Sequence, residues 1–162
     1  MEQLNPIEWA ILPLKKYATF SGRAPRPEFW WFVLLYVTVQ ALASALDYVL
    51  GLPKLRLGYG AARLVLGLIT LFPLLAVCVR RLHDLGRTGL WVLGVWFLGS
   101  VAYGVVVASR MAGAITTMEL FSVLKLAVWA MLLVFCALPG TRGPNGYGAD
   151  PYAEPDLEEV FA

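Results

Sequence analysis

Charged residues are scarce in this sequence. They make up 15% of its 162 residues, whereas hydrophobic residues make up 59% and the mean hydropathy is +0.69. A soluble domain carries about 25% charged residues, because its surface must face water. The deficit therefore argues against an ordinary soluble domain and predicts a protein whose surface faces hydrocarbon. The formal net charge of +2 is too small to indicate nucleic-acid binding.

Cysteine and histidine are also rare. The two cysteines, Cys78 and Cys136, lie inside apolar runs, where we expect small packing residues and no disulfide. A single histidine, His83, argues against a metal site. The sequence contains no nucleotide-binding loop, cysteine metal knuckle, zinc-protease helix motif or nucleophile elbow. We therefore assign no catalytic residue, no metal and no cofactor.

Long apolar runs dominate what is present. A helix rises about 1.5 Å per residue, so about 20 residues cross the hydrocarbon of a bilayer. The runs are continuously apolar, whereas the strands of a membrane barrel alternate. The second run is the shortest and contains Pro73, so we expect it to kink, tilt or extend back through Gly60 and Ala61. The sequence predicts an all-α membrane protein with four transmembrane helices, at residues 29–50, 64–79, 90–108 and 121–138.

The chain divides into an N-terminal segment (1–28), a transmembrane domain (29–138) and a tail (139–162). The N-terminal segment mixes apolar, aromatic and basic residues, which is typical of a segment lying in the headgroup region. It has no continuous apolar core, so we expect no cleavable signal peptide. The tail is rich in proline, glycine and asparagine and ends with acidic residues, which predicts an irregular segment.

The basic residues predict an orientation, because cytoplasmic loops carry an excess of lysine and arginine. With the N-terminus inside, the cytoplasmic side holds Lys15, Lys16, Arg23, Arg26, Arg80, Arg81, Arg87 and Arg142. The outer side then holds Lys54, Arg56, Arg63, Arg110 and Lys125. This bias of eight against five predicts that both termini are cytoplasmic.

Three segments look unlike generic membrane sequence. They are Phe20–Phe32 before the first helix, Arg80–Trp91 between the second and third, and Gly143–Pro151 in the tail. Together they resemble the YhaH-like family of bacterial inner-membrane proteins, known as domain of unknown function 805. The resemblance covers the chain from about Tyr17 to Pro151. It implies a multi-pass fold in the bacterial inner membrane and brings no established activity with it.

The first motif places Arg23 and Arg26 just before an aromatic cluster at residues 29–32. Arginine pairs bidentately with phosphate, and tryptophan prefers the membrane interface. This arrangement is typical of anchoring among anionic lipid headgroups, and a specific lipid or phosphate site is the alternative. Gly22 and the nearby prolines favour a defined turn.

The second motif places His83 beside Asp84, in an expected loop of about ten residues with Arg80, Arg81 and Arg87. The aspartate would orient the imidazole or hold it protonated, which gives a proton-handling group. A network of hydrogen bonds that braces the loop is the alternative. We also assign the three arginines of this loop, with Arg23 and Arg26, to anionic headgroup or phosphate binding.

The predicted topology brings these motifs to one face. The first helix starts, the second ends, the third starts and the fourth ends on the cytoplasmic side. We therefore expect Glu28 and the arginines to meet His83 and Asp84, with Asn145, Tyr147 and Asp150 folding back over them. Such a cluster would bind an anionic group or lock the helix ends together through ion pairs.

Polar residues inside the predicted spans form a second set. Gln40, Ser44 and Asp47 share one face of the first helix, because they follow one another at about one turn. A carboxylate in hydrocarbon needs a partner or a wet cavity. Arg63 and Lys125 lie at a similar depth to Asp47 and are its expected partners. The stripe suits a small channel or carrier, and equally polar packing between helices.

Gly22-Arg23 and Gly86-Arg87 each precede an aromatic-rich helix that begins a hairpin. The four helices therefore also fit two parallel hairpins related by an axis along the membrane normal.

Three functions are consistent with these features. The first is a membrane protein that binds anionic lipid or a partner protein through its basic and aromatic cytoplasmic face. The second is a small transporter or channel, formed as a homo-oligomer around the polar stripe. The third is a membrane enzyme acting on lipid headgroups, which rests on His83 and Asp84.

Overall fold

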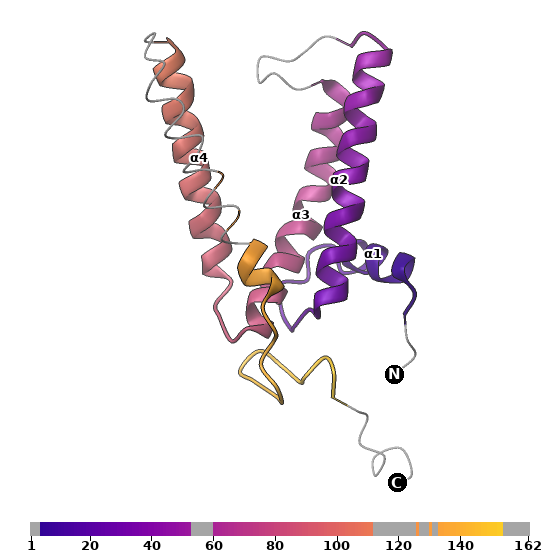
Figure 1. Ribbon diagram of the computed structural model, residues 1–162, viewed down its shortest axis with the longest axis vertical. Coiled ribbons are helices and arrows are strands. Elements are labelled where there is room, and N and C mark those ends of the chain that lie inside the picture. Colours follow the sequence, from indigo (N-terminus) through magenta and orange to yellow (C-terminus); the bar gives the residue numbers. More distant parts are fainter. Residues whose placement is uncertain (1–3, 53–59, 112–125, 127–129, 131–132, 154–162) are drawn as a thin grey trace.

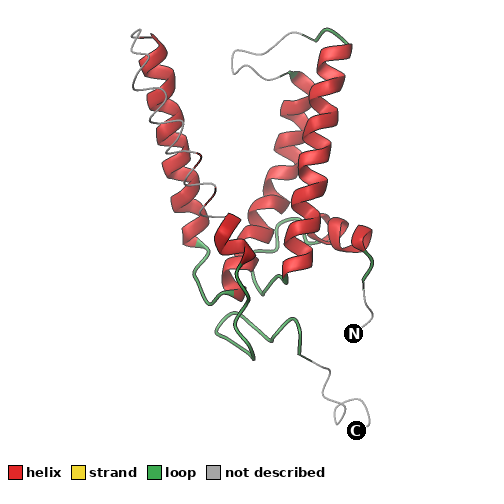
Figure 2. Ribbon diagram, viewed as in Figure 1, coloured by secondary structure: helices red, strands yellow, loops and turns green. Residues whose placement is uncertain are grey.

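The computed structural model describes residues 4–52, 60–111, 126, 130 and 133–153. These residues form four helices, α1 (Pro6–Lys15), α2 (Arg26–Val49), α3 (Ala61–Asp84) and α4 (Leu90–Met111). A short helical stretch follows at 133–137, and no strand occurs within the described ranges (Figure 2). The predicted all-α class is therefore confirmed.

The helix termini follow local capping chemistry. The side chain of Asn5 accepts from the Glu8 amide, and the Glu8 carboxylate accepts from the Asn5 amide, which makes a capping box at the start of α1. Pro25 is the N-cap of α2, and Pro27 stands in its first turn, where the missing amide hydrogen costs nothing. After α3, Gly86 has φ +68°, the left-handed conformation that ends many helices.

Two helices, α2 and α3, are long and apolar enough to cross a membrane. Each has 24 residues, and their most apolar windows have mean hydropathies of 1.7 and 2.3. Only 17% and 22% of the residues in those windows are buried, whereas the core helix of a soluble protein is mostly buried. The third predicted span coincides with α4. Most of the fourth, at 121–138, lies outside the described residues, so four crossings remain a prediction.

The second span was expected at 64–79, or with an extension back through Gly60 and Ala61. α3 begins at Ala61, as that extension predicts, but it runs on to Asp84 where a loop of about ten residues was expected. A span predicted from hydropathy ends at the first charged residue. Here the charged side chains of the last turn are buried and paired, so the helix continues through them. His83 and Asp84 therefore lie on a helix.

The helices are arranged around one well-packed end (Figure 1). α2 and α3 lie side by side, α1 crosses them near the start of α2, and α4 diverges from α3. We call the end where α2 begins, α3 ends and the tail lies the tail end, and the opposite end the loop end. The buried apolar core belongs to the tail end and includes Phe29, Phe32, Val77, Leu82 and Cys136.

A proline inside α3 helps to fix the N-terminal segment. Pro73 has no amide hydrogen, so the carbonyl of Ile69, four residues earlier, loses its helical partner. The hydroxyl of Tyr17, just after α1, donates to that carbonyl at 2.6 Å. The Tyr17 ring also stacks on Phe72, with centroids 6.2 Å apart. The segment before α2 is thus held against the side of α3.

Candidate functional site

Five charged side chains are buried together at the tail end. Arg23 precedes α2, Glu28 lies in the first turn of α2, and Arg80, Arg81 and Asp84 belong to the last turns of α3. Each side chain is at most 2% exposed. We call these five residues the arginine cluster. Burying an unpaired charge costs roughly several kcal/mol of folding free energy. The stability of the arginine cluster therefore depends on the ion pairs and hydrogen bonds that its members make.

Asp84 is the centre of the arginine cluster. Its Oδ1 accepts from Arg23 Nε at 2.9 Å and lies 2.8 Å from Arg23 Nη2. Its Oδ2 accepts from Arg81 Nη1, one helical turn earlier. One carboxylate therefore joins two guanidinium groups that come from different segments of the chain.

The remaining donors of these arginines reach backbone carbonyls. Arg81 Nε donates to the carbonyl of Cys136 at 3.0 Å, Nη1 to that of Ala24 at 3.3 Å, and Nη2 to that of Leu138. Arg23 Nη1 donates to the carbonyl of Gly143 at 2.6 Å. These bonds tie the end of α3 to the segment before α2 and to the tail. A planar guanidinium with five donors is suited to join several segments at once.

Arg80 forms a second pair on the side toward α1. Its Nη1 donates to Glu28 Oε1 at 2.5 Å, and Lys16 Nζ lies 3.7 Å from Glu28 Oε2. The carbonyl of Arg80 accepts from the Ala24 amide at 3.0 Å. Arg80 Nε and Nη2 have no hydrogen-bond partner among the described residues. The pair connects α2, α3 and the end of α1.

The tail covers His83. Its ring stacks on Tyr147, with centroids 4.0 Å apart and planes within 7°. Its Nδ1 lies 3.1 Å from the carbonyl oxygen of Gly22, which can only accept, so Nδ1 carries the hydrogen of this bond. Asn145 Nδ2 donates to the carbonyl of His83 at 3.0 Å. The imidazole is therefore engaged on a ring face and on one nitrogen.

Asp150 fixes the turn of the tail. Its carboxylate accepts from the amide of Tyr152 at 2.9 Å and from that of Gly143 at 2.7 Å. These two hydrogen bonds, together with the charge of Arg23, lower the pKa of Asp150 below its ordinary value. The ionised carboxylate is thus the form that holds the tail in its folded shape.

The backbone of the tail at Gly140 lies so close to Asp84 that a residue with a side chain would not fit there. Thr141 donates to the Asp84 carbonyl through its amide at 2.8 Å and its hydroxyl at 3.0 Å. A Cβ added to the preceding residue, Gly140, would lie 2.1 Å from Asp84 Oδ2. Glycine at this position therefore permits the contact.

Other basic side chains of the tail end do not take part in the arginine cluster. Lys15, Arg87 and Arg142 are exposed, and their side chains make no hydrogen bond or ion pair within the described part of the chain. Arg26 is half-buried and uses its Nε on the carbonyl of Leu138 at 3.2 Å. Arg26, Arg142, Asp150 and other residues line a polar hollow of about 250 Å³. Nearby on α2, Trp30 and Trp31 are each 39% exposed.

The predicted site residues thus fall into two groups. The expected meeting of the motifs is present: Arg23, Arg80, Arg81, His83 and Asp84 lie together, with the tail over them. Of the five arginines predicted to bind anions, three are buried and paired internally, whereas Arg26 and Arg87 remain at the surface. Binding by any of them stays a prediction.

Sequence reasoning missed Gly140 and Thr141, which contact Asp84, and the bond from Tyr17 to Ile69. The run around Gly140 indicated only turns. Pro73 was a usable signal for a free carbonyl four residues earlier, although it did not indicate the donor.

The predicted polar stripe lies between α2 and α3. Asp47 is 8% exposed and accepts from the backbone amides of Ala62 at 2.9 Å and Arg63 at 3.0 Å. Asp47 therefore caps α3 in place of its N-cap, Gly60, which has no side chain. A Cβ on Gly60 would lie 2.2 Å from Asp47 Cγ. Lys125, the other expected partner, lies outside the described residues.

The other two stripe residues differ in their partners, because Gln40 Nε2 is buried and has no hydrogen-bond partner among the described residues. The Ser44 hydroxyl donates to the carbonyl of Gln40 at 2.8 Å, within α2. The amide side chain of Gln40 would lie 3.4 Å from a Cβ on Gly67 of α3. Within the described ranges, no group of three or more His, Cys, Asp or Glu residues is placed to hold a metal ion.

The chain resembles several bacterial proteins along most of its length. It is 35% identical to "Inner membrane protein YhaI" of Escherichia coli strain K12, over 90% of this chain and 96% of that protein. It is 30% identical to "Inner membrane protein YhaH" of the same strain, over 92% and 100%. It is 33% identical to "Uncharacterized protein YiiR", over 82% and 85%. No solved structure matches it.

The family described as "Protein of unknown function (DUF805)" matches residues 17–149, a range that contains the first two sequence motifs and the arginine cluster. Two long apolar helices and the names of the relatives agree on an inner-membrane protein. The chain is a member of the DUF805 family.

Proposed function

We propose that this chain crosses the inner membrane four times, with both termini in the cytoplasm, and binds anionic lipid headgroups through its tail end. The binding groups are the exposed cations Lys15, Arg87 and Arg142, with Arg26 beside the polar hollow. The arginine cluster acts as a structural lock that fixes the positions of these groups. This assignment divides the basic residues between two roles.

The division of the basic residues is the observation that carries the proposal. Arginines that serve only the fold are expected to find acceptors inside the protein, as Arg23 and Arg81 do. The exposed cations have no such acceptor among the described residues, and Trp30 and Trp31 lie at the same end. Each cation near an anionic membrane surface contributes about 1 kcal/mol. Aromatic side chains at headgroup depth are typical of the interface.

Lipid retention by the purified protein tests the binding role. The triple variant Lys15→Gln, Arg87→Gln, Arg142→Gln removes three charges and no side-chain hydrogen bond or ion pair seen among the described residues. We expect the preference for phosphatidylglycerol over phosphatidylethanolamine to fall about fivefold for each charge removed. The control Lys15→Arg, Arg87→Lys, Arg142→Lys keeps the charges and should keep the preference. An unchanged preference in the first variant contradicts the proposal.

The topology is tested separately. A reporter enzyme that is active only in the periplasm is fused after Ala162. We expect no activity from this fusion, because the excess of basic residues keeps the tail inside. Full activity would overturn the proposed orientation.

The alternatives receive less support from the contacts. Asp47 caps α3 and Ser44 bonds within α2, which disfavours a transport path through these two residues, although Gln40 Nε2 has no hydrogen-bond partner among the described residues. His83 is stacked and bonded under the tail, which supports a bracing role over acid–base chemistry.

A further inference from the structure

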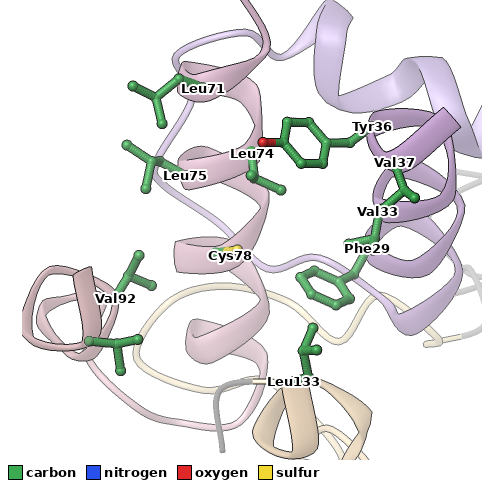
Figure 3. A pocket seen from close by; sticks show the side chains of 11 residues that line it. Phe29, Val33, Tyr36, Val37, Leu71, Leu74, Leu75, Cys78, Val92 and Leu133 are labelled. Atoms are coloured by element: carbon green, nitrogen blue, oxygen red, sulfur yellow. The ribbon is translucent and has the colours of Figure 1, made fainter. Parts of the chain in front are cut away.

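An apolar cleft lies between the helices above the arginine cluster. It has a volume of about 420 Å³ and is bounded by α2, α3, α4 and the segment that carries Leu133 (Figure 3). Phe29 and Val37 line it from α2, Leu75 from α3 and Val92 from α4. Small-molecule sites occupy about 300–1,000 Å³ and have mostly apolar walls. The cleft therefore has the size and lining of a binding site.

One polar group stands out among these walls. Tyr36 lines the cleft, and its side chain extends from α2 toward Leu74 of α3 (Figure 3). Its hydroxyl makes no hydrogen bond to any residue in the described ranges. This hydroxyl is not among the buried side-chain atoms that lack a partner, so it does not require an acceptor inside the cleft.

The cations of the tail end lie close along the chain to the walls of the cleft. Arg26 precedes Phe29 by three residues on α2, which is about one helical turn. Arg87 precedes Val92 by five residues and is exposed. A molecule in the cleft that extended toward this end would meet positive charge. This pattern of charge complements an anionic head attached to an apolar body.

We infer that the cleft holds one hydrocarbon chain of the anionic phospholipid whose headgroup contacts the exposed cations. The inference rests on the proposed function and adds to it a site for the chain. Because lipid and protein are equally apolar here, van der Waals contacts with the walls of the cleft are what holds the chain against exchange with the bilayer.

The cleft is a poor site for a second copy of the protein. A helix with its side chains is about 10 Å across and rises about 5.4 Å per turn, so a volume near 420 Å³ takes about one turn. A single lipid chain is thinner and fits such a volume along its length.

Cleft-filling variants test the inference. Val37 lines the cleft and is 55% exposed, and Val65 on α3 is also 55% exposed but is not among the residues that line it. Val37→Phe therefore narrows the cleft, and Val65→Phe is the matched control. Leu75→Phe repeats the test from another helix. The probe is palmitoyl-oleoyl phosphatidylglycerol added to delipidated protein and counted by native mass spectrometry, with oligomeric state read from the same spectra.

We expect Val37→Phe and Leu75→Phe each to weaken retention of this lipid about fivefold, because many chain contacts are lost together. Val65→Phe should match the wild type. Dihexanoyl phosphatidylglycerol, which has the same head and short chains, should bind all variants alike.

Equal retention by Val37→Phe and Val65→Phe would overturn the inference while leaving the cation test of the proposed function intact. A change of oligomeric state in Val37→Phe without loss of lipid would assign the cleft to a second copy and overturn it as well. Loss of long-chain lipid in the cleft variants but not in the triple glutamine variant would contradict the proposed function and would leave a chain site that is not linked to the exposed cations.

Discussion

Each end of the molecule buries one aspartate of the helix pair, but the two carboxylates have different partners. At the tail end Asp84 is 0% exposed and lies between Arg23 and Arg81. At the loop end Asp47 is 8% exposed and accepts two backbone amides at the start of α3. Both carboxylates lie against a glycine whose Cβ would overlap them, Gly140 in one case and Gly60 in the other.

The difference shows what each end is built to do. The backbone amides at the start of α3 are neutral donors that carry a partial positive charge from the helix dipole. Asp47 therefore acts mainly as a hydrogen-bond acceptor, and its negative charge contributes only modestly. Asp84 neutralises full charges that would otherwise be buried. Three buried arginines thus join α2, α3 and the tail at the tail end, and the exposed cations that we propose to contact lipid belong to the same end.

The largest expected effect comes from opening the lock. Arg81→Ala leaves Asp84 with one fewer cation and removes three bonds to carbonyls, so we expect it to lower the free energy of unfolding by about 3–5 kcal/mol. Arg87→Ala removes an exposed arginine of the same end and should change it by less than about 0.5 kcal/mol. Denaturant unfolding in detergent measures both. Similar values for the two variants would contradict the lock.

Substitution of Gly140 or Gly60 should lower the stability by a smaller amount, one at each end of the molecule. Gly140→Ala and Gly60→Ala each place a methyl group onto a carboxylate, and we expect each to cost about 1–3 kcal/mol of stability. Gly146→Ala meets nothing within 4 Å and is the control. Thermal unfolding of the three variants tests this order. If Gly140→Ala were as stable as Gly146→Ala, the close approach of the tail to Asp84 would be wrong.

The smallest effect is a pH dependence confined to the tail. Because the pKa of Asp150 is lowered in the folded protein, its contribution is complete above the ordinary value of 3.8 and is lost as the pH falls through the lowered value. We therefore expect the Gly143 amide to lose exchange protection below pH 3.8, after correction for intrinsic rates.

Asp150→Asn should remove this dependence, while the amide of Ala62 at the loop end serves as the internal reference. Protection of Gly143 that follows pH equally in Asp150→Asn would assign the effect to another group.

The sequence predicts the helical class, the membrane location and the meeting of the motifs, because these follow from hydropathy and from the order of the helices. It does not separate Arg81 from Arg87. Both residues are arginines and lie close together in the chain. They differ only in the folded protein, where Arg81 reaches the Asp84 carboxylate and the carbonyls of the tail. The partner of Asp47 was also not predictable from charge, because backbone amides satisfy it.

Helix ends were the least predictable part of the fold. A hydropathy window ends a span at the first charges, so it stopped α3 before Arg80. The helix continues to Asp84 because the arginines of its last turns find partners from segments more than 50 residues away. Such partners are absent from any local window of sequence.

The most direct test of this account compares Asp84→Asn with Asp47→Asn. Asparagine keeps one acceptor oxygen at Asp47 but loses the second of its two bonds to backbone amides, so we expect a cost of about 1–2 kcal/mol. At Asp84 it leaves Arg23 and Arg81 buried without a counter-ion, and we expect a loss of about 3–5 kcal/mol. Denaturant unfolding of both variants in the same detergent decides the matter. Equal losses, or a larger loss at Asp47, would contradict the claim that the tail end is a charge lock.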